Sequence, residues 1–363
     1  MLTLCKSYSE RERVLSGNPI ASPDIRDSCG STPRARTAVI ILNWNNSHLT
    51  LQLVEQFLEF ESECDIVVVD NFSKREERDI LTSFFYNRNW AIVKENEIAG
   101  RYRSHCRATL LLLESNYGYA RGNNYGMRFA SRNGYEFVLV SNNDVILEAP
   151  VLGDLLKIMD GSSNIALIGP VIIDPFGNRQ GPFSKPTLLG QFAVPFFFPI
   201  VWPLLKILES IKTRLHKKSL SFPYRLMGCF MLGRLSVMKE IDFFDENTFL
   251  YAEELILAEK LRMKGFLTAF EPTVHVKHLH AMSTATINDR RRFEMNLESD
   301  LYYFKNYRNY GRISLSLISL GRRTMFFLWI PLLRKLKTIV GLAFHPSHCF
   351  RQNRNGSSSD YMN

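Results

Sequence analysis

The apolar positions of the chain follow two periods, and their alternation predicts a succession of strands and helices. Some runs are apolar throughout, as in strands buried on both faces of a sheet, whereas others place apolar residues three and four positions apart, as on one face of a helix. Repeated strand–helix units of this kind predict an α/β fold, with a mostly parallel sheet covered by helices on both faces. The predicted strands are residues 38–42, 65–70, 109–114, 136–140 and 165–173, and the predicted helices are residues 48–60, 75–85 and 118–132.

The same pattern divides the chain into four parts. Residues 1–36 lack periodicity and the long apolar core of a signal peptide, so we expect a flexible leader. The alternating elements fill a first half at residues 37–150 and a second half at residues 151–310. The second half contains an apolar insert at residues 186–218, and residues 311–363 form a basic, amphipathic tail.

Polar residues follow four of the predicted strands. In a parallel sheet the carboxyl ends of the strands meet at one edge, where ligands bind. One polar strand end would be an ordinary turn, but four together predict a binding site. These strand ends are Asn43-Trp44-Asn45-Asn46, Asp70-Asn71-Phe72-Ser73, Ser115-Asn116-Tyr117-Gly118 and Ser141-Asn142-Asn143-Asp144.

The insert contains an uncharged stretch at residues 186–205 that is long enough to span a bilayer. Pro195, Pro199 and Pro203 recur within it, and each removes a helix hydrogen bond and leaves a carbonyl group unsatisfied in lipid. A straight transmembrane helix is therefore not expected. The alternatives are an interfacial or re-entrant membrane element and an internal loop packed on the tail, and the five basic residues at positions 206–218 favour the former.

The net charge of +9 is concentrated in the tail. No acidic residue lies between Asp300 and Asp360, whereas that stretch contains ten Lys and Arg residues and apolar runs at residues 313–321 and 325–333. Apolar and basic residues together fit an anionic membrane surface better than they fit nucleic acid. The alternative is a solvated basic face on a hydrophobic helix.

Composition excludes several classes of protein. With 45% hydrophobic and 22% charged residues, the chain is neither disordered nor of low complexity. A mean hydropathy of −0.11 excludes a polytopic membrane protein. The six cysteines form no CxxC pair and are far apart, which indicates reduced thiols rather than a disulfide framework or a zinc site.

Two acidic elements are candidates for chemistry. Asp144 follows a predicted strand, where a carboxylate can bind Mg²⁺ or Mn²⁺, although a lone Asp there is also an ordinary turn residue. Glu253 and Glu254 open a predicted helix that runs to Lys264. Adjacent carboxylates at a helix start can simply complement the helix dipole. The aromatic residues at positions 243–251 indicate a pocket wall beside them instead.

Eight short motifs occur in order over about residues 38–310. They are VIILNWN at 39–45, VVVDNFS at 67–73, NYGYARGNNYG at 116–126, NND at 142–144, MGCFML at 227–232, FLYAEE at 249–254, KLRMKG at 260–265, and His278 five residues before Ser283. In this order the motifs resemble those of family-2 glycosyltransferases of the GT-A fold, in particular the rhamnosyltransferase-like branch. The resemblance implies that the first half binds a nucleotide-sugar and that the second half holds the acceptor and the catalytic residues.

The resemblance also implies roles for individual residues. Asp144 falls on the last carboxylate of the family's metal-binding motif, which implies Mg²⁺ or Mn²⁺ as cofactor. Glu254 falls on the family's catalytic carboxylate, with Glu253 beside it as a secondary candidate. Glycines in the loop at 116–126 are expected to let the main chain approach the nucleotide. The implied donor-binding residues are Asn43, Asn45, Asp70, Asn71, Asn116, Gly118, Gly122, Asn123, Asn143, Lys260 and His278.

Four positions depart from the family's pattern. Asn142 replaces the first Asp of the metal-binding motif, and Glu254 is one methylene longer than the usual Asp. Ile256 replaces a second Asp, and Lys260 replaces an Arg. A misplacement of a catalytic group by about 1 Å can lower a rate on the order of a hundredfold, so these departures bear on activity.

The resemblance implies a metal-dependent, inverting glycosyltransferase that moves a hexosyl or rhamnosyl group. The donor would be a dTDP- or UDP-sugar, and the acceptor a lipid-linked saccharide in cell-surface polysaccharide synthesis. We expect the protein at the cytoplasmic face of the cell membrane, peripheral or monotopic. The alternatives are a catalytically impaired nucleotide-binding scaffold of the same fold and a nucleotidyltransferase.

Overall fold

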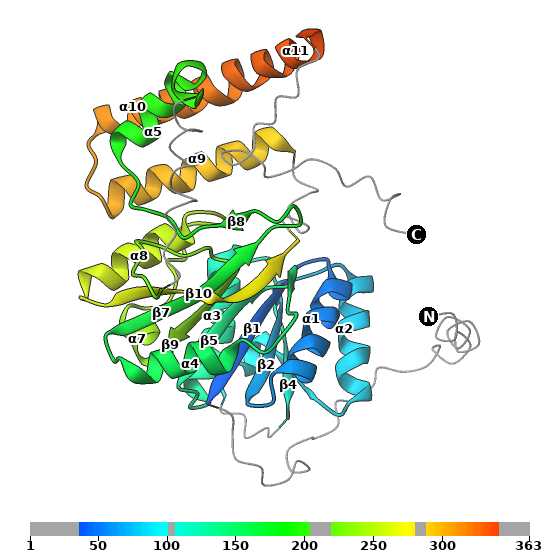
Figure 1. The fold of residues 1–363 in the computed structure, drawn as a ribbon. Coiled ribbons are helices and arrows are strands. Elements are labelled where there is room, and N and C mark those ends of the chain that lie inside the picture. The colour runs from blue at the N-terminus through cyan, green and yellow to red at the C-terminus, as the bar shows by residue number, and fades with distance from the viewer. Residues whose placement is uncertain (1–35, 101–105, 204–218, 280–287, 341–363) are drawn as a thin grey trace.

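The computed structural model describes residues 36–100, 106–203, 219–279 and 288–340. The predicted leader, except for Arg36, lies outside the described residues, as do residues 204–218 of the insert and 341–363 of the tail. In Figure 1 a twisted sheet with helices on both faces forms the lower part of the molecule, and a layer of further helices lies above it.

One sheet runs through both predicted halves, in the strand order β3-β4-β2-β1-β5-β9-β7-β10-β6, with β8 paired to β7. The strands from β1 to β5 are parallel to one another, whereas β9 is antiparallel to β5 and β7. The mostly parallel α/β sheet is therefore confirmed. The strands are β1 (Thr37–Asn43), β2 (Cys64–Asp70), β3 (Ala91–Lys94), β4 (Ala108–Leu112), β5 (Phe137–Asn142), β6 (Val145–Ile146), β7 (Ile165–Ile173), β8 (Arg179–Gln180), β9 (Phe230–Arg234) and β10 (Leu267–His278).

Two hydrophobic cores cover the two faces of the sheet, because successive residues of a strand point to opposite faces. Val39 and Ile41 of β1 pack with α1, α2 and α4, whereas Ala38 and Ile40 pack with α3, α7 and α8. Strands with two buried faces must be apolar throughout, which explains the continuous apolar runs. The helices are α1 (Ser47–Phe60), α2 (Arg75–Asn87), α3 (Gly118–Arg132), α4 (Leu152–Gly161), α7 (Leu235–Glu240) and α8 (Glu253–Met263).

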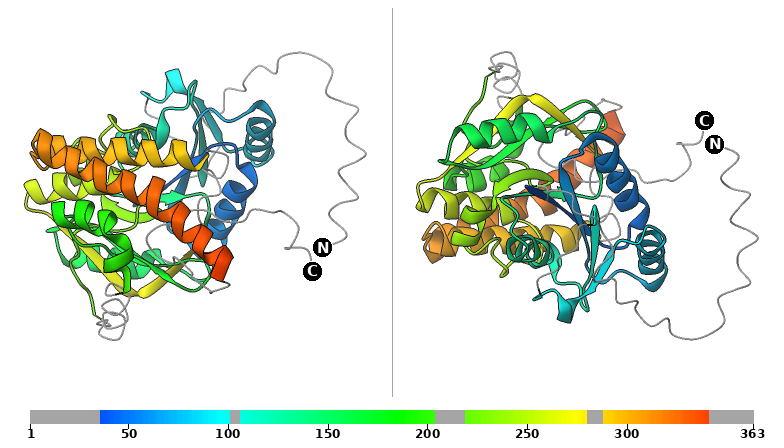
Figure 2. Two further views of the ribbon diagram at one scale, coloured as in Figure 1. Left: turned by 90° about the horizontal axis from the view of Figure 1, so that it is seen from above. Right: turned by 90° about the horizontal axis from the view of Figure 1, so that it is seen from below.

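A third core joins α8 to the upper helical layer. Ile256 of α8 is fully buried with Tyr303 and Phe304 of α9 and Ile318 of α10. The views along the vertical axis in Figure 2 show α10 and α11 running across α9. The layer therefore packs on α8. Its elements are α5 (Leu188–Phe196), α9 (Asp289–Asn306), α10 (Arg312–Thr324), the π-helix η2 (Met325–Trp329) and α11 (Ile330–Val340).

The described part of the insert forms a helix that packs on the tail. A Cβ atom added at Gly321 of α10 would lie 2.5 Å from the carbonyl oxygen of Phe192, so α5 and α10 approach closely. The indole Nε1 of Trp329 donates a hydrogen bond of 2.7 Å to the carbonyl oxygen of Phe196. This packing corresponds to the internal alternative, because one face of the insert is covered by protein. Its other face is exposed at Leu189 and Ile200.

Candidate active site

Asn43 and Asp70 end neighbouring strands and lie opposite each other in the register of β1 and β2. Asn43 Nδ2 donates to Asp70 Oδ1 and to Ser73 Oγ, both at 3.0 Å. Arg78 Nε donates to Asp70 Oδ2 at 3.0 Å, and the Asn43 and Asp70 side chains are buried. Asn43 and Asp70, two of the predicted donor-binding residues, therefore lie together in a fixed arrangement at the carboxyl edge of the sheet.

Thr50 of α1 links this pair to the end of β5. Its Oγ1 donates to Asn43 Oδ1 at 2.7 Å and accepts a hydrogen bond of 3.0 Å from Asn143 Nδ2. Asn45 lies nearby in the left-handed region, with φ of 52°, and its backbone N–H donates to Ser73 Oγ at 2.9 Å. Asn43, Asn45 and Asn143 thus belong to one buried polar network.

Asn71 and Asn116 join the loops after β2 and β4. Asn71 Nδ2 donates to Asn116 Oδ1 at 3.0 Å and to the Gly118 carbonyl oxygen at 3.1 Å. The backbone N–H of Gly118 also donates to Asn116 Oδ1, at 3.0 Å. These bonds fix the turn that leads into α3.

The glycines of this turn face protein atoms rather than open space. A Cβ atom at Gly118 would lie 2.3 Å from the Phe249 carbonyl oxygen, and one at Gly122 would lie 2.8 Å from Leu42 Cδ1. The missing side chains therefore permit close contact between protein segments, and the predicted approach of the main chain to a nucleotide stays a prediction. Asn123 in the same helix is buried, and its Oδ1 has no hydrogen-bond partner among the described residues.

Asp144 forms a buried pair with His278, which ends β10. His278 Nε2 lies 3.1 Å from Asp144 Oδ1, and its Nδ1 lies 3.1 Å from Gln180 Oε1. Burial acts to lower the pKa of the His278 imidazole, but its interactions with Cys229 and with the Asp144 carboxylate outweigh burial and raise the pKa well above its usual value. Asp144 and His278 are 134 positions apart in the chain, and the fold brings them together as one buried pair.

A divalent ion fits this centre only with help from substrate. Among the described ranges no group of three or more His, Cys, Asp or Glu side chains could hold a metal ion. Asp144 offers a carboxylate, and Mg²⁺ or Mn²⁺ takes few protein ligands and completes its shell with water and substrate phosphate oxygens. The Oδ1 atom of Asn142 is buried without a partner in the described part of the chain, so a further oxygen is available close to Asp144 in sequence. The donor set is thus compatible with the predicted ion.

Glu253 and Glu254 open α8 in different environments. Glu254 Oε1 accepts a hydrogen bond of 3.1 Å from the Gly228 backbone N–H, and this side chain is partly exposed. Glu253 is buried, and its Oε1 has no hydrogen-bond partner within the described residues. Burial, together with the neighbouring Glu254 charge, raises the pKa of Glu253 to about 8. The burial of Glu253 disfavours its charged form, whereas Glu254 is partly exposed, which favours Glu254 as the acceptor of a proton.

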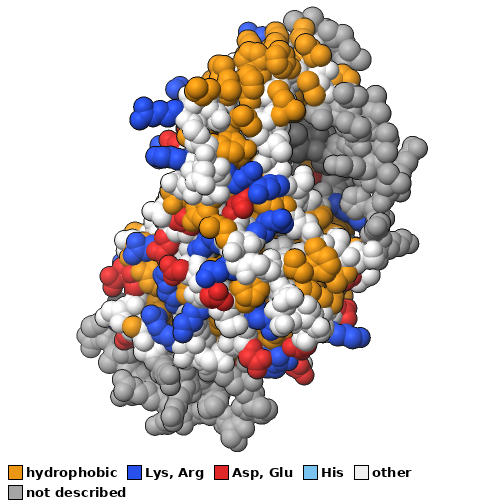
Figure 3. All heavy atoms as spheres, turned by 90° about the vertical axis from the view of Figure 1, so that its left-hand side faces the viewer, with side chains coloured by type: hydrophobic (Ala, Val, Ile, Leu, Met, Phe, Trp, Pro, Cys, Tyr) orange, Lys and Arg blue, Asp and Glu red, His pale blue; other side chains and the backbone are white. Residues whose placement is uncertain are grey.

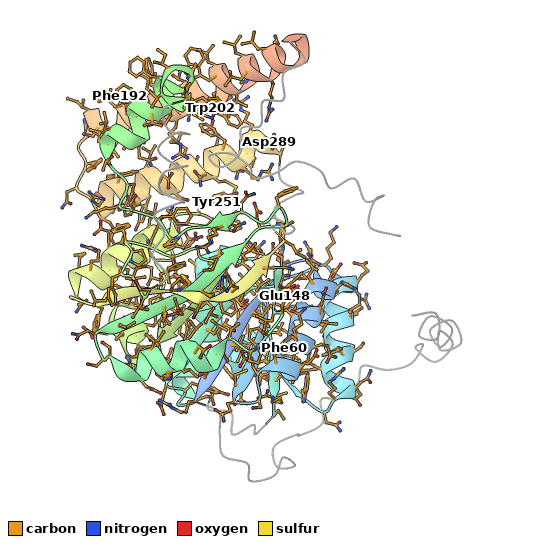
Figure 4. The ribbon with its side chains drawn as sticks, viewed as in Figure 1. Phe60, Glu148, Phe192, Trp202, Tyr251 and Asp289 are labelled. Atoms are coloured by element: carbon orange, nitrogen blue, oxygen red, sulfur yellow. The ribbon has the colours of Figure 1, made fainter. Side chains whose placement is uncertain are left out.

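The turn before these carboxylates is strained. Tyr251 and Ala252 both adopt positive φ angles, of 74° and 65°, which residues other than glycine rarely adopt. Ser299 Oγ of α9 donates a hydrogen bond of 2.8 Å to the Leu250 carbonyl oxygen and holds the turn from above. Figure 4 shows Tyr251 between the sheet and α9.

Tyr119 is a site residue that the sequence did not identify. Its hydroxyl donates a hydrogen bond of 2.8 Å to the Gly228 carbonyl oxygen. Burial, with the nearby charges of Glu254, Glu253 and Asp144, raises its pKa well above the usual value. Tyr119 therefore lies among the three candidate carboxylates.

Two residues that depart from the family's pattern make contacts within the protein. Lys260 Nζ donates to the backbone carbonyl oxygens of Phe243, at 2.8 Å, and Asp242, at 3.2 Å, so it fixes the loop before Tyr251 and Ala252, and its donor-binding role stays a prediction. It lies seven residues along α8 from Glu253, about 10 Å at 1.5 Å per residue. Ile256 packs in the third core, where an Asp would be buried among apolar side chains. Its departure from the family's pattern thus has a packing reason.

Known proteins resemble part of the chain. An N-acetylglucosaminyl-diphospho-decaprenol L-rhamnosyltransferase of Mycobacterium tuberculosis is 29% identical over 154 residues, which are 41% of this chain and 48% of the relative. The low-salt glycan biosynthesis hexosyltransferase Agl10 of Haloferax volcanii is 24% identical over 205 residues, which are 55% of this chain and 62% of the relative. The chain thus matches only about half to three fifths of the length of these relatives.

Two solved structures share the fold. GalNAc-T7 with UDP, GalNAc and Mn²⁺ superposes with a TM-score of 0.53 at 13% identity, over 83% of this chain and 57% of the other. The mannosyltransferase PcManGT of Pyrobaculum calidifontis, in complex with GDP-Man and Mn²⁺, superposes with a TM-score of 0.50 at 14% identity, over 87% and 82% of the two chains. These likenesses confirm the GT-A fold.

The sequence profile of one family covers both the parallel strands and the start of β9. Residues 38–232, more than half of the 363-residue chain, match the glycosyl transferase family 2 profile. This region contains the Asn43–Asp70 network, Asp144 and Gly228. With the fold and the ordered site residues, the match shows that the chain belongs to glycosyl transferase family 2.

Proposed function

We propose that the protein transfers a sugar from a nucleotide-sugar donor to a hydroxyl group of a glycan acceptor. The observation that carries the proposal is the position of two carboxylates on either side of Gly228 and Cys229. Glu254 accepts a hydrogen bond from Gly228, and Cys229 interacts with His278, which pairs with Asp144. A candidate base and a candidate phosphate-side centre therefore lie within reach of one substrate.

The proposed reaction is a single displacement. Glu254 accepts the proton of the acceptor hydroxyl while that oxygen bonds to the anomeric carbon of the donor sugar. The bond between the anomeric carbon and the phosphate oxygen breaks, and the nucleoside diphosphate leaves. One displacement inverts the configuration at the anomeric carbon. Tyr119 and Ser299 act indirectly, because they hold the Gly228 carbonyl and the turn before Glu254 in place.

Asp144 would hold a divalent ion, Mg²⁺ or Mn²⁺, with the paired His278 beside it. When bound, such an ion neutralises charge that develops on the leaving diphosphate. The two solved structures that share the fold contain Mn²⁺, which supports this part of the proposal. The pairing of Asp144 with His278 keeps the carboxylate in one orientation toward the leaving group.

We further propose a UDP- or dTDP-sugar as donor and a lipid-linked saccharide as acceptor. The solved structures contain UDP in one case and GDP-Man in the other. The name of the mycobacterial relative specifies a decaprenol-linked acceptor and rhamnosyl transfer. These proteins support a nucleotide-sugar donor and a lipid-linked acceptor. The identity of the transferred sugar has to be determined by experiment.

A panel experiment tests the proposed function. The full-length protein is incubated with membranes, Mn²⁺ and a series of nucleotide-sugars, and the released nucleotide products are identified. We expect nucleoside diphosphate from one donor. Release of pyrophosphate would indicate a nucleotidyltransferase, and donor binding without release would indicate an impaired scaffold.

A further inference from the structure

The outer face of the helical layer carries an exposed apolar surface that the active site does not use. Nine of the eighteen large hydrophobic side chains that are exposed among the described residues belong to residues 188–200 and 312–336 of this layer. Figure 3 shows hydrophobic side chains gathered at this end of the molecule, over α5, α10 and α11. We call this surface the apolar cap, and it consists of Leu189, Phe197, Ile200, Ile313, Leu320, Phe327, Leu328, Leu332 and Leu336.

Few of the aromatic side chains of the insert belong to the cap. Of the aromatic residues in the insert, Phe198 is buried, and Phe196 accepts a hydrogen bond from the Trp329 indole through its carbonyl oxygen. Phe197 is the aromatic side chain of that stretch that is exposed. Aliphatic side chains therefore provide most of the cap.

The π-helix η2 keeps the apolar stripe in line along the tail. Ile313 and Leu320 lie seven residues apart and share one face of α10. In an uninterrupted α-helix, Leu328 would be rotated by about 80° from Leu320, at about 100° per residue. The Ile330 N–H donates to the Met325 carbonyl, five residues back, so η2 takes up one extra residue. Leu328 thereby returns to within about 20° of the stripe.

The two segments that form the cap carry charges of one sign, and Arg322 and Arg323 among them pair with Asp300 and Glu294 of α9. These segments, residues 187–203 and 312–336, contain five basic residues and no acidic residue. Arg312 and Lys335 are exposed near the two ends of the tail helix. A second copy of the chain would bring two basic surfaces together, which disfavours self-association through the cap. Apolar area bordered by cations instead fits a surface that offers both hydrocarbon and negative charge.

We propose that the apolar cap docks on the surface of an anionic lipid bilayer, with the helix from Arg312 to Leu336 lying in the plane of the headgroups. This helix is long and apolar enough to cross a membrane by length and composition. Its packing argues for the in-plane position, because Arg322 pairs with Asp300 of α9 at 2.6 Å and both side chains are nearly buried. Phe326 also stacks on Phe293 of α9, with ring centroids 4.2 Å apart. A spanning helix would lose these contacts and place Arg322 in the hydrocarbon region.

Docking would orient the active site toward the bilayer. α9 lies between α10 and the catalytic turn, and Ser299 of α9 binds the Leu250 carbonyl oxygen. A lipid-linked acceptor would thus meet the site from the side of the cap. This consequence rests on the proposed function, whereas the docking itself does not.

Vesicle co-sedimentation of the full-length protein tests the proposal without donor or acceptor. Vesicles of phosphatidylcholine alone are compared with vesicles that also contain phosphatidylglycerol. We expect binding to the anionic vesicles, weakened but not abolished by high salt, because burial of apolar side chains is not screened. The double variant Leu328→Ser/Leu332→Ser should bind roughly tenfold more weakly.

The matched control is Ile80→Ser/Met263→Ser, which removes exposed apolar side chains from α2 and α8, away from the cap. It should bind as the wild type does. Both double variants are first shown to keep the wild-type melting temperature. Equal losses in the two variants, equal binding to neutral and anionic vesicles, or no sedimentation of the wild type would overturn the proposal. If the wild type forms a dimer that only the variant Leu328→Ser/Leu332→Ser loses, and if that variant binds vesicles as the wild type does, the cap binds a second copy of the chain instead.

Discussion

A carboxylate that is buried beside an imidazole is tightly constrained, and Asp144 is in this position with His278. We expect Asp144→Asn to lower sugar transfer at least about a hundredfold, because the amide keeps the shape but loses the charge that would hold a divalent ion. Excess EDTA should have the same effect on the wild type, and added Mn²⁺ should restore it. The exposed Asp154→Asn serves as control. Full activity of the wild type in EDTA would contradict the assigned role.

Glu253 makes folding stability depend on pH. Its pKa is raised from 4.5 to about 8 in the folded protein, so the folded state holds a proton that the unfolded state has lost over that interval. Its contribution to stability is full below about pH 4.5 and is lost as the pH rises through about 8. We therefore expect the melting temperature of the wild type to fall relative to that of Glu253→Gln between about pH 5 and pH 9.

The control for this titration is Glu63→Gln, which removes an exposed carboxylate. Its melting temperature should stay parallel to that of the wild type. A difference between wild type and Glu253→Gln that does not change with pH would show that Glu253 does not titrate in this range.

Some site residues could be predicted from sequence and others could not, for physical reasons. Asp70 and Asp144 are polar residues directly after apolar strands, where parallel topology places ligands. Tyr119 is not distinguishable in sequence from other aromatic residues in a helix, because its role depends on the distant Gly228 carbonyl. Lys260 was assigned from a matching charge, but the direction of its side chain is set by the loop that it binds.

At the scale of elements, the turn into α3 depends on a glycine that packs against the catalytic loop. Gly118 has φ of +77°, and its missing Cβ leaves room for the Phe249 carbonyl. Gly134 has φ of +80° with no atom within 4 Å of its missing Cβ, so Gly134→Ala isolates the cost of the backbone conformation. That cost is about 1–2 kcal/mol.

We expect Gly118→Ala to reduce the free energy of unfolding by clearly more than Gly134→Ala does, because the new methyl group meets a backbone atom. The same variant should also lower the rate of sugar transfer, because Phe249 lies shortly before Glu254 in the loop that leads into α8. Urea unfolding of both variants measures the difference. Equal losses would mean that the Phe249 loop moves away without cost.

The hydrophobic pattern predicted most of the strands and helices of the first half, and it missed both short and long elements elsewhere. α3 and β7 begin and end where the pattern placed them. β6 and β8 have two residues each and β3 has four, so no period can be recognised in them. β10 alternates exposed and buried residues in its second half and follows a helix directly, and it was not predicted either.

At the scale of the whole molecule, the basic tail is part of the catalytic unit rather than a separate appendage. Ile318 of α10 is fully buried in the core that contains Ile256 of α8, whereas Leu320 of the same helix is 50% exposed. We expect Ile318→Ala to cost about 2–5 kcal/mol of unfolding free energy and Leu320→Ala less than about 0.5 kcal/mol.

Unfolding should remain a single transition in both variants if the upper layer and the sheet form one cooperative unit. Calorimetry of the full-length protein distinguishes this outcome from separate unfolding. If unfolding instead shows two transitions, and Ile318→Ala lowers the temperature of the first without changing the second, the layer is an independent domain.

The central claim is that Glu254 accepts the acceptor proton and that Glu253, which is buried and has a raised pKa, does not. Acceptor-dependent release of nucleoside diphosphate is measured at about pH 7 for the wild type, Glu254→Gln and Glu253→Gln, together with donor affinity. We predict that Glu254→Gln keeps donor affinity and loses turnover by about two to four orders of magnitude, and that Glu253→Gln loses less. A Glu254→Gln variant that turns over as fast as the wild type, or faster than Glu253→Gln, would contradict the account.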